Sequence, residues 1–375
     1  MKPSEKLFFE ILQAGLWNKP IETTATRETL LQVIRLSMLQ AVLGIVGDVI
    51  VSHESLSALL SEEELKVLRK FVMTNLSTSR TWNIAVQKIV KEMRANDIEP
   101  ILLKGQGIAQ YYPNPDLRQC GDIDLYIRPV DFDRACEVIS AMASPEERRA
   151  AFSLKKHHQI KLGKVPVEIH RYTDIYYPAR LNRIYQSISD DGVSTDTMTL
   201  HLFDIDVTTP SLNFNAFYLF SHFWHHFIAE GVGLRQIIDW ALLFNRFSDQ
   251  IDAEYLRNVL LKMHLMKQWV VFGHIVVDFL GLPKEKFPLY SEKYKNLSEK
   301  VLSIILVEGN FGNANNKGTN RPQGYLNGKL YAMFRHLKRN LRVISLFPRD
   351  ALFYIIRKIG NGIKAVFLDI FRKKS

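Results

Sequence analysis

The sequence predicts an α+β protein in which a small mixed sheet lies between helical N-terminal and C-terminal regions. Segments near the N-terminus carry apolar residues at helical spacing, at 5–16, 26–50, 62–76 and 81–96. Short apolar or alternating runs typical of strands come next, at 101–103, 122–127, 155–162 and 165–172. Helical patterns return at 213–230, 234–247, 256–272 and 274–282. Strands grouped between runs of helices predict one sheet with helical flanks.

These patterns divide the 375 residues into five parts. We predict an N-terminal helical region over residues 1–80, an α/β core over 81–210 and a C-terminal helical domain over 211–308. Residues 309–325 are rich in Gly and Asn and lack apolar periodicity, which predicts a flexible loop. Residues 326–375 alternate apolar clusters with Lys and Arg, which predicts a basic amphipathic tail.

The composition indicates a globular protein without a membrane-spanning segment. Hydrophobic residues make up 47% of the chain, yet no apolar stretch is long enough to cross a bilayer. Glu5 and Glu10 lie among the first apolar residues, which is untypical of a signal peptide. Cys120 and Cys136 are too few for a disulfide framework or a zinc site. We therefore expect a cytoplasmic protein with free thiols.

The net charge of +10 is concentrated near the C-terminus. Residues 321–375 hold 13 Lys and Arg against Asp350 and Asp369, so the preceding residues are close to neutral overall. A basic amphipathic helix binds an anionic membrane surface or nucleic acid. The tail therefore predicts one of these partners, and the first would place the protein at the inner face of the membrane. A charged outer face on an ordinary packed helix is the alternative.

Residues 98–128 are the stretch best suited to chemistry. Ile101-Leu102-Leu103 is a short apolar run that stops at Lys104, which predicts a buried strand entering a glycine turn at Gly105. A short helix is expected next, over residues 107–112. Asp122 and Asp124 then alternate with apolar residues, so both carboxylates project from one face of a strand.

A pair of carboxylates this close predicts a bound cation. Two ionised carboxylates repel each other unless a proton or a cation lies between them. Mg²⁺ takes oxygen ligands, usually carboxylates, water and substrate phosphates, so a D-x-D beside a glycine turn indicates phosphate chemistry. In V-P-V-E-I-H-R, Glu168 and His170 project from one face of a later strand, which makes Glu168 a candidate third ligand. The alternative is that the acidic residues only form a solvated face of a strand. We interpret a second D-x-D, at Asp204 and Asp206, as such an exposed face, because no glycine turn precedes it.

These motifs resemble the polymerase-beta-type nucleotidyltransferase superfamily and, more narrowly, the bacterial uncharacterised nucleotidyltransferase family. The similarity extends from about residue 83 to about residue 247, through L-L-K-G, R-Q-C-G-D-I-D-L, V-E-I-H, H-F-W-H-H and G-L-R-Q-I-I-D-W. It implies that the predicted sheet is a nucleotidyltransferase core. It also implies that His222, Arg235 and Asp239 line the cleft opposite the carboxylates, and we add His170 to this cleft. A packed histidine and a helix salt bridge are the alternatives.

The glycine turn departs from the superfamily pattern. The superfamily has Gly-Gly or Gly-Ser at this point, whereas this sequence has Gly105-Gln106-Gly107. Without a serine hydroxyl, backbone N–H groups and the helix N-terminus are left to hold a phosphate. Gly105, Gln106 and Gly107 are therefore candidate nucleotide-binding residues. Lys104 and Arg118 are candidates for neutralising phosphate charge, with ordinary salt bridges as the alternative.

The predicted function is metal-dependent transfer of a nucleoside monophosphate from an NTP to a hydroxyl acceptor. Asp122, Asp124 and Glu168 would hold Mg²⁺ or Mn²⁺ for two-metal catalysis, with a general-base role as the alternative for Glu168. The sequence does not identify the acceptor. Two other functions stay open: a catalytically silent nucleotide-binding or regulatory protein with a surface-binding tail, and a D-x-D glycosyltransferase. A P-loop kinase is excluded because the motif G-x-x-x-x-G-K-[ST] is missing.

Overall fold

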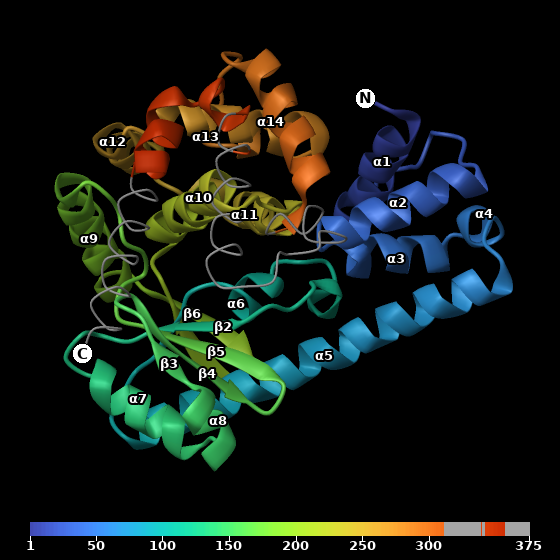
Figure 1. Cartoon of the computed structure of the whole chain (residues 1–375). Coiled ribbons are helices and arrows are strands. Elements are labelled where there is room, and N and C mark those ends of the chain that lie inside the picture. The colour runs from blue at the N-terminus through green and yellow to red at the C-terminus, as the bar shows by residue number, and fades with distance from the viewer. Residues whose placement is uncertain (311–338, 340–341, 357–375) are drawn as a thin grey trace, which may run out of the picture.

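The computed structural model describes residues 1–310, 339 and 342–356 of the chain (Figure 1). Apart from residues 309 and 310, the flexible loop predicted at 309–325 lies outside the described residues. The basic tail predicted at 326–375 also lies outside them, except for Arg339 and residues 342–356. Within the part of the chain that is described, no helix combines the length and the hydropathy needed to cross a membrane.

A seven-stranded mixed sheet forms the centre of the α/β core, with the strand order β3-β4-β5-β2-β1-β7-β6. Its strands are β1 (Ile101–Leu102), β2 (Ile123–Tyr126), β3 (Phe152–Ser153), β4 (His157–Leu162), β5 (Val165–His170), β6 (Met198–Leu202) and β7 (Ile205–Thr209). Strand β2 runs parallel to β5 and antiparallel to β1, and β1 runs parallel to β7. The predicted α+β class with a mixed sheet is therefore confirmed.

The register of the central strands sets the position of the acidic residues. Asp124 on β2 pairs with Glu168 on β5, and Tyr126 pairs with His170 two positions further along. Paired residues of neighbouring strands project from the same face of a sheet. The parallel pairing of β2 with β5 therefore brings the third carboxylate beside the D-x-D.

The two faces of the sheet meet different helices. Helices α5 (Glu62–Ala95) and α7 (Phe132–Ala141) cover one face, where their apolar residues share a hydrophobic core with Leu125, Val167 and Ile169. The opposite face lies toward α10 (Leu212–Ala229) (Figure 1), whose His222 contacts Lys104, two residues after β1. Because side chains alternate along a strand, the acidic residues of β2 and β5 face α10.

The N-terminal helices pack against the C-terminal helices. They are α1 (Pro3–Trp17), α2 (Arg27–Leu39), α3 (Leu43–Ser52) and α4 (Glu54–Ser57). Both groups of helices contribute to one hydrophobic core. Helix α1 is also tied to the C-terminal region by the indole of Trp17, which donates a hydrogen bond of 2.6 Å to the carbonyl of Leu280.

The single helix predicted at 26–50 is wrong, because the chain turns between α2 and α3. Ala41 has a φ of 56°, in the left-handed region. The preceding Gln40 is fully buried, and its side-chain amide donates to the carbonyls of Ile305 and Leu306. These long-range hydrogen bonds stabilise a break that the local helical pattern does not indicate.

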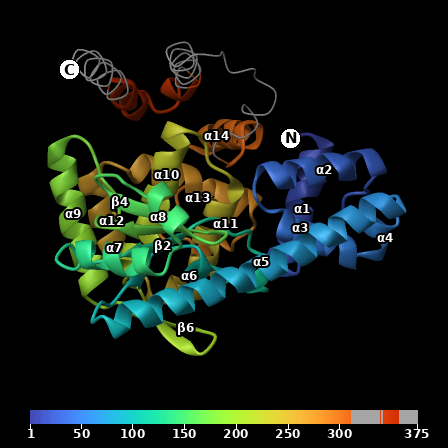
Figure 2. The ribbon, with the colours of Figure 1, turned by 60° about the horizontal axis from the view of Figure 1, so that its bottom comes forward.

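Helix α5 is one continuous helix of 34 residues, where the sequence predicted separate helices at 62–76 and 81–96. Its Ser- and Thr-rich middle stays helical, and the hydroxyl of Thr81 donates back to the carbonyl of Ser77 at 3.0 Å. Figure 2 shows α5 extending from the N-terminal helices to the sheet. The boundary predicted at residue 80 falls inside this helix, and the division of the chain at that point stays a prediction.

The C-terminal helices are α10, α11 (Leu234–Phe247), α12 (Ala253–Met263), α13 (Met266–His274) and α14 (Lys295–Glu308), with a π-helical turn (Ile275–Phe279) continuing α13. Phe220, Trp240 and Trp269 form part of their core, with ring centroids 4.7 to 5.4 Å apart. The break predicted at residue 273 is misplaced, because His264 has a φ of 59° and ends α12 instead.

The remaining elements are short or lie at the edges of the core. They are α6 (Gln106–Ala109), α8 (Pro145–Ala150), α9 (Ala179–Ser194) and the 3₁₀ turns Pro115–Leu117, Ser248–Gln250 and Lys284–Lys286. Strands β6 and β7 form an edge hairpin around the second D-x-D. Asp204 lies in its turn, 3.0 Å from Nζ of Lys91, and Asp206 lies 3.0 Å from Nδ1 of His201. Both carboxylates of this motif are therefore paired.

Candidate active site

A cavity of about 340 Å³ lies between the polar face of the sheet and helices α10 and α11. Of the predicted site residues, all except Gln106 and Gly107 line it. The cavity is also lined by residues that were not among the predicted site residues, namely Gly121, Lys156, His157, Leu219, His226 and Gln236. The fold therefore brings together residues from distant parts of the chain.

The carboxylates of Asp122, Asp124 and Glu168 converge on one wall of this cavity. Asp122 directly precedes β2, Asp124 lies on β2, and Glu168 is its partner on β5. One oxygen of each carboxylate lies within 4.8 Å of the other two. The arrangement concentrates negative charge at the end of the cavity next to the glycine turn.

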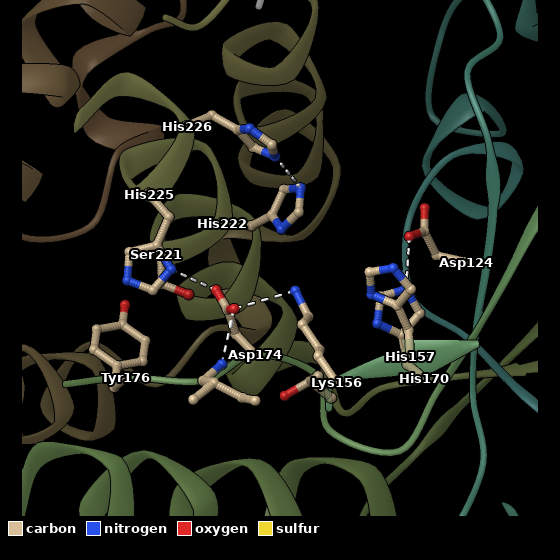
Figure 3. A network of polar contacts seen from close by, with 12 residues as sticks. Asp124, Lys156, His157, His170, Asp174, Tyr176, Ser221, His222, His225 and His226 are labelled. Atoms are coloured by element: carbon tan, nitrogen blue, oxygen red, sulfur yellow. Dashed lines mark hydrogen bonds and ion pairs between the residues drawn. The ribbon is translucent and has the colours of Figure 1, made fainter. Parts of the chain in front are cut away.

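His170 connects two of these carboxylates. Its Nε2 lies 2.9 Å from Oδ1 of Asp124 (Figure 3) and 3.2 Å from Oε2 of Glu168. A carboxylate oxygen that is ionised only accepts hydrogen bonds, so Nε2 of His170 must carry a proton. The imidazole therefore holds the side chains of Asp124 and Glu168 in position.

Lys104 supplies a positive charge beside the carboxylates. Its Nζ lies 3.1 Å from Oδ1 of Asp124 and 3.0 Å from Nε2 of His222. Burial alone would lower the pKa of Lys104, but Asp124, Asp122 and Glu168 outweigh burial and raise this pKa above its ordinary value. Lys104 is therefore a buried cation at neutral pH.

The pairing with Lys104 determines the protonation of two histidines on α10. An ammonium group only donates, so Nε2 of His222 must accept from Lys104. Nε2 of His226 lies 3.1 Å from the same atom and must therefore be the donor of that pair (Figure 3). Burial and the charge of Lys104 lower the pKa of His222 well below its usual value, and that of His226 to about 3. Both imidazoles are neutral at pH 7.

Burial and neighbouring charges also set the protonation of the carboxylates. Repulsion by Asp124, together with burial, raises the pKa of Asp122. Burial acts to raise the pKa of Asp124 as well, but Lys104 and His170 outweigh it and hold that pKa well below its usual range. For Glu168, burial acts to raise the pKa, and the hydrogen bond from His170 lowers it, with a net decrease. Asp124 and Glu168 are therefore ionised at neutral pH.

Arg118 forms a buried ion pair with Asp239 of α11. Its Nε lies 2.8 Å from Oδ1 and its Nη2 lies 2.7 Å from Oδ2, and the two side chains are only 6% and 4% exposed. The hydroxyl of Tyr112 donates to the same Oδ1 at 2.7 Å. The salt-bridge alternative for Arg118 is therefore present, because its guanidinium is already engaged by Asp239.

Arg235, one turn before Asp239 on α11, lies next to the D-x-D. Its Nη1 donates to the carbonyl of Gln119 at 2.8 Å, and a Cβ placed on Gly121 would lie 3.6 Å from its Nη2. Its Nε is buried and has no hydrogen-bond partner among the described residues. Arg235 thus brings a second positive charge to the cavity beside Asp122.

The glycine turn contributes through Gly105. This residue has φ 66° and ψ −115°, a conformation that is open to glycine and strained for other residues. A Cβ at this position would lie 3.4 Å from the carbonyl oxygen of Asp122. Gly107 faces the sheet instead, since a Cβ there would lie 3.3 Å from Cδ2 of Leu102. Only the first glycine of the turn therefore lines the cavity.

Gln106 points away from the cavity and into the fold. Its side chain is 2% exposed, and its amide donates to Oδ1 of Asn83 on α5. Its Oε1 accepts from the thiol of Cys120 at 3.4 Å. The side chain that stands in place of the usual glycine or serine thus anchors the turn to α5.

The carboxylates fit a divalent cation such as Mg²⁺ or Mn²⁺, since both ions take carboxylate oxygens. Asp124 is 1% exposed, and its Oδ2 has no hydrogen-bond partner within the part of the chain that is described. A buried polar atom left unpaired is costly. A cation held by Asp122, Asp124 and Glu168 would give Oδ2 of Asp124 the partner that it lacks.

A second cavity, of about 750 Å³, adjoins the first at Lys156, which lines both. Asp174 lies on its wall, with Oδ1 3.1 Å from Nζ of Lys156 and Oδ2 2.6 Å from Nδ1 of His225 (Figure 3). Burial acts to raise the pKa of Asp174, but Lys156 and His225 hold it well below its usual range. The ring of Tyr176 lies against His225, with centroids 4.3 Å apart. No motif in the sequence indicated this network.

The structure places a glycine turn after one strand, a D-x-D on the next and a third carboxylate on a parallel neighbour, which is the arrangement that the resemblance to nucleotidyltransferases implies. The chain belongs to the uncharacterised nucleotidyltransferase family, whose model matches residues 28–281. The predicted family is thereby confirmed, and the match extends on both sides of the similarity expected over 83–247.

The comparison with solved structures finds a distant similarity to an antigenic nucleotidyltransferase-like protein from Paracoccidioides brasiliensis. The two chains are 14% identical, the TM-score is 0.32, and the match covers 50% of this chain and 87% of the fungal one. No curated protein is significantly similar to this sequence.

Proposed function

We propose that this protein transfers a nucleoside monophosphate from an NTP to a hydroxyl acceptor in a metal-dependent reaction. The observation that carries the proposal is the convergence of Asp122, Asp124 and Glu168 on one cavity wall, beside the turn at Gly105. Mg²⁺ or Mn²⁺ held by these carboxylates would neutralise the triphosphate and stabilise the charge that develops during transfer.

The positive side chains around the carboxylates suit a triphosphate. Lys104 forms an ion pair with Asp124, in which Nζ lies 3.1 Å from Oδ1, so its charge lies directly beside the carboxylates. Arg235 lies beside Gly121, and its Nε has no partner among the residues described. We assign phosphate binding to these two residues. Arg118 would act indirectly, by fixing α11 through Asp239.

The acceptor would enter through the larger cavity. Lys156 lines both cavities, and Tyr176 and Trp224 provide an aromatic wall. His225 also lines this cavity, and in the neutral form of its ring, with Nδ1 donating to Asp174, Nε2 is the hydrogen-bond acceptor. We therefore propose that His225 accepts the hydrogen bond of the acceptor hydroxyl. General-base action by Glu168 is the alternative, since it requires only hydrogen-bond reach to that hydroxyl.

One observation favours a second candidate, a protein that binds a nucleotide without transferring it. The turn has Gln106 where a serine would offer a hydroxyl, and this side chain is committed to Asn83 and Cys120. Nucleotide would then be held by the carboxylate-bound cation, Lys104 and Arg235 alone. Metal-dependent NTP binding without any labelled product would support this candidate.

The experiment that tests the proposal compares two double variants that carry the same chemical change. Asp122→Asn with Asp124→Asn removes the carboxylates of the cavity, and Asp204→Asn with Asp206→Asn removes those of the edge hairpin. Each protein is incubated with an NTP labelled in its α-phosphate, Mg²⁺ or Mn²⁺, and fractionated cell extract as a source of acceptors. We expect transfer of label to fall by about 100-fold or more in the first variant, as when charge-stabilising groups are removed from an active site.

The edge-hairpin variant controls for effects on folding and net charge. It should retain wild-type transfer, because Asp204 and Asp206 lie on the edge hairpin and are paired with Lys91 and His201. Equal transfer by the wild type and the Asp122→Asn, Asp124→Asn variant would contradict the proposal.

A further inference from the structure

A histidine pair lies directly beside the proposed carboxylate site. His157 on β4 is the cross-strand partner of His170 on β5, and their ring centroids are 5.2 Å apart. Glu168 lies two positions before His170, so all three side chains project from the same face of the β4–β5 hairpin. Figure 3 shows the two rings together below Asp124.

The side chains of this group converge closely enough to share one ion. His157, Glu168 and His170 each offer one ligand atom within 4.8 Å of the other two. Nδ1 of His157 lies 3.8 Å from Oε2 of Glu168, and Nε2 of His170 lies 3.2 Å from the same oxygen. A bound ion would take the place of the proton that Nε2 of His170 carries in the ion-free site, since imidazole ligands bind metals through an unprotonated nitrogen. The side chain of His170 is 1% exposed, and those of His157 and Glu168 are 15% and 16% exposed.

The buried nitrogen of His157 lacks a partner. Its Nδ1 makes no hydrogen bond to any described residue, although it points to the same side of the hairpin as Glu168. A buried acceptor or donor without a partner costs free energy that a bound ion or an ordered water would recover. The imidazole therefore has a free coordination position at the wall of the cavity.

We infer that His157, His170 and Glu168 form a mixed imidazole–carboxylate site for a transition-metal ion of the Mn²⁺, Co²⁺ or Zn²⁺ type. This inference rests on the proposed metal-dependent function and names the ion that Glu168 holds. Imidazole nitrogen suits these ions, whereas Mg²⁺ takes oxygen ligands almost exclusively. Asp122 and Asp124 provide an oxygen-only site next to it, with Glu168 shared between the two.

The two adjacent sites in the cavity should prefer different metal ions. The carboxylate site accepts Mg²⁺ or Mn²⁺, because it offers oxygen atoms alone. The histidine-containing site discriminates, because affinity for nitrogen ligands rises from Mn²⁺ through Co²⁺ toward the later ions, with Zn²⁺ also well suited. The protein should therefore bind Mn²⁺ and Co²⁺ more tightly than Mg²⁺. This difference in affinity should depend on His157.

The test measures metal binding to the full-length protein, without nucleotide. Isothermal titration with Mg²⁺ and with Mn²⁺ is performed on the wild type, on His157→Gln and on His158→Gln. His158 is the matched control, because it is the next residue on β4, projects from the opposite face and bonds to Ser153 at 2.8 Å. We expect His157→Gln to weaken Mn²⁺ binding by about tenfold or more. Loss of a residue that only orients a metal ligand already weakens metal binding by about tenfold, and loss of a ligand should weaken it at least as much. Binding of Mg²⁺ should change by less than about twofold, because His157 is not a ligand of the oxygen-only site.

A spectroscopic measurement keeps the inference testable if a variant folds poorly. Pulsed electron paramagnetic resonance of bound Mn²⁺ detects the nuclear coupling of a coordinated nitrogen, and the wild type alone is sufficient for it. Nitrogen coupling in the wild type that is weaker in His157→Gln, where His170 is the remaining nitrogen ligand, and unchanged in His158→Gln supports the site. Absence of nitrogen coupling in the wild type, or an unchanged ratio of Mn²⁺ to Mg²⁺ affinity in a folded His157→Gln variant, overturns it.

Failure of this inference is distinguishable from failure of the proposed function. If Mg²⁺ still binds through Asp122 and Asp124 and label is still transferred from the NTP, the nucleotidyltransferase proposal stands and the imidazole ligands are excluded. If neither ion binds to the wild type and no label is transferred from the NTP, both are excluded.

Discussion

Replacing Asp239 by Asn is expected to destabilise the fold substantially without changing the shape of the side chain. Asp239 is the counter-ion of Arg118, with contacts of 2.7 and 2.8 Å and almost complete burial of both groups. Asn keeps one oxygen for Nε of Arg118 and for the hydroxyl of Tyr112. Its amide nitrogen would face Nη2 of Arg118, so two donors would oppose each other and the guanidinium would remain as a buried, uncompensated charge.

The structure sets the size of this effect. Breaking a buried ion pair by removing one partner costs about 3–5 kcal/mol. At about 2.1 cal/mol/K per residue, a chain of 375 residues has an unfolding entropy of about 0.8 kcal/mol/K. The loss therefore corresponds to a decrease in Tm of about 4–6 °C, provided that the chain unfolds cooperatively.

The assay is thermal unfolding followed by circular dichroism, with two further variants. Asp116→Asn removes the partner of Arg80, an ion pair of 3.4 Å whose arginine is 70% exposed, and should lower the free energy of unfolding by less than about 1 kcal/mol. Arg118→Met combined with Asp239→Leu should recover most of the loss, because well-packed apolar residues commonly replace a buried ion pair without destabilisation. A Tm for Asp239→Asn within about 1 °C of the wild type would refute the structural role of this pair.

Two further predictions concern the turn and the response to pH. Gly105→Ala and Gly163→Ala both place a side chain at positive φ, 66° and 61°, and each should cost about 1–3 kcal/mol in urea unfolding. Only Gly105→Ala should also weaken the binding of a labelled NTP, because its Cβ meets the carbonyl of Asp122 and the space around Gly163 is open; equal NTP binding by both variants would contradict the role of the turn. Folded His222 and His226 have lowered pKa values, that of His226 about 3, whereas the unfolded chain takes up these protons near pH 6.5. Their contribution to stability is therefore complete above pH 6.5 and is lost as the pH falls toward the folded values, by at most about 1.4 kcal/mol per pH unit for each histidine. Urea unfolding between pH 7.5 and 5.5 should show a shallower slope for His226→Gln than for the wild type, and an unchanged slope would contradict the neutral, buried state of this residue.

The elements that the sequence predicted well are those that a local period specifies. Alternation along 122–127 predicted a strand with both acidic residues on one face, and the structure has β2 at this position. The V-E-I-H pattern likewise corresponds to β5. The Ser-x-x-Glu pattern of Ser61 and Glu64 is typical of a helix start, and the two residues form a reciprocal cap at the N-terminus of α5. In each case the information lies within a few residues, which is the range over which backbone periodicity and capping operate.

The boundaries that were wrong depend on contacts with distant residues. The turn between α2 and α3 is held by Gln40, whose partners are some 265 positions further along the chain. The middle of α5 lies between the two helices that the sequence predicted, yet it remains helical where the side chain of Gln106 donates to the carbonyl of Ser79. Local propensity is weak in comparison with such tertiary contacts.

The sequence by itself determined which residue types are candidates for the proposed chemistry, because the D-x-D strand, the glycine turn and the single acid of V-E-I-H are each encoded by neighbouring residues. Only the tertiary structure decided which of the surrounding groups face the cavity. It pairs Arg118 with Asp239, turns Gln106 toward α5, and sets His157 beside His170 and Lys156 between two cavities. The physical reason is that burial and charge pairing are properties of the packed molecule, and a linear sequence does not state which distant side chain will supply the partner.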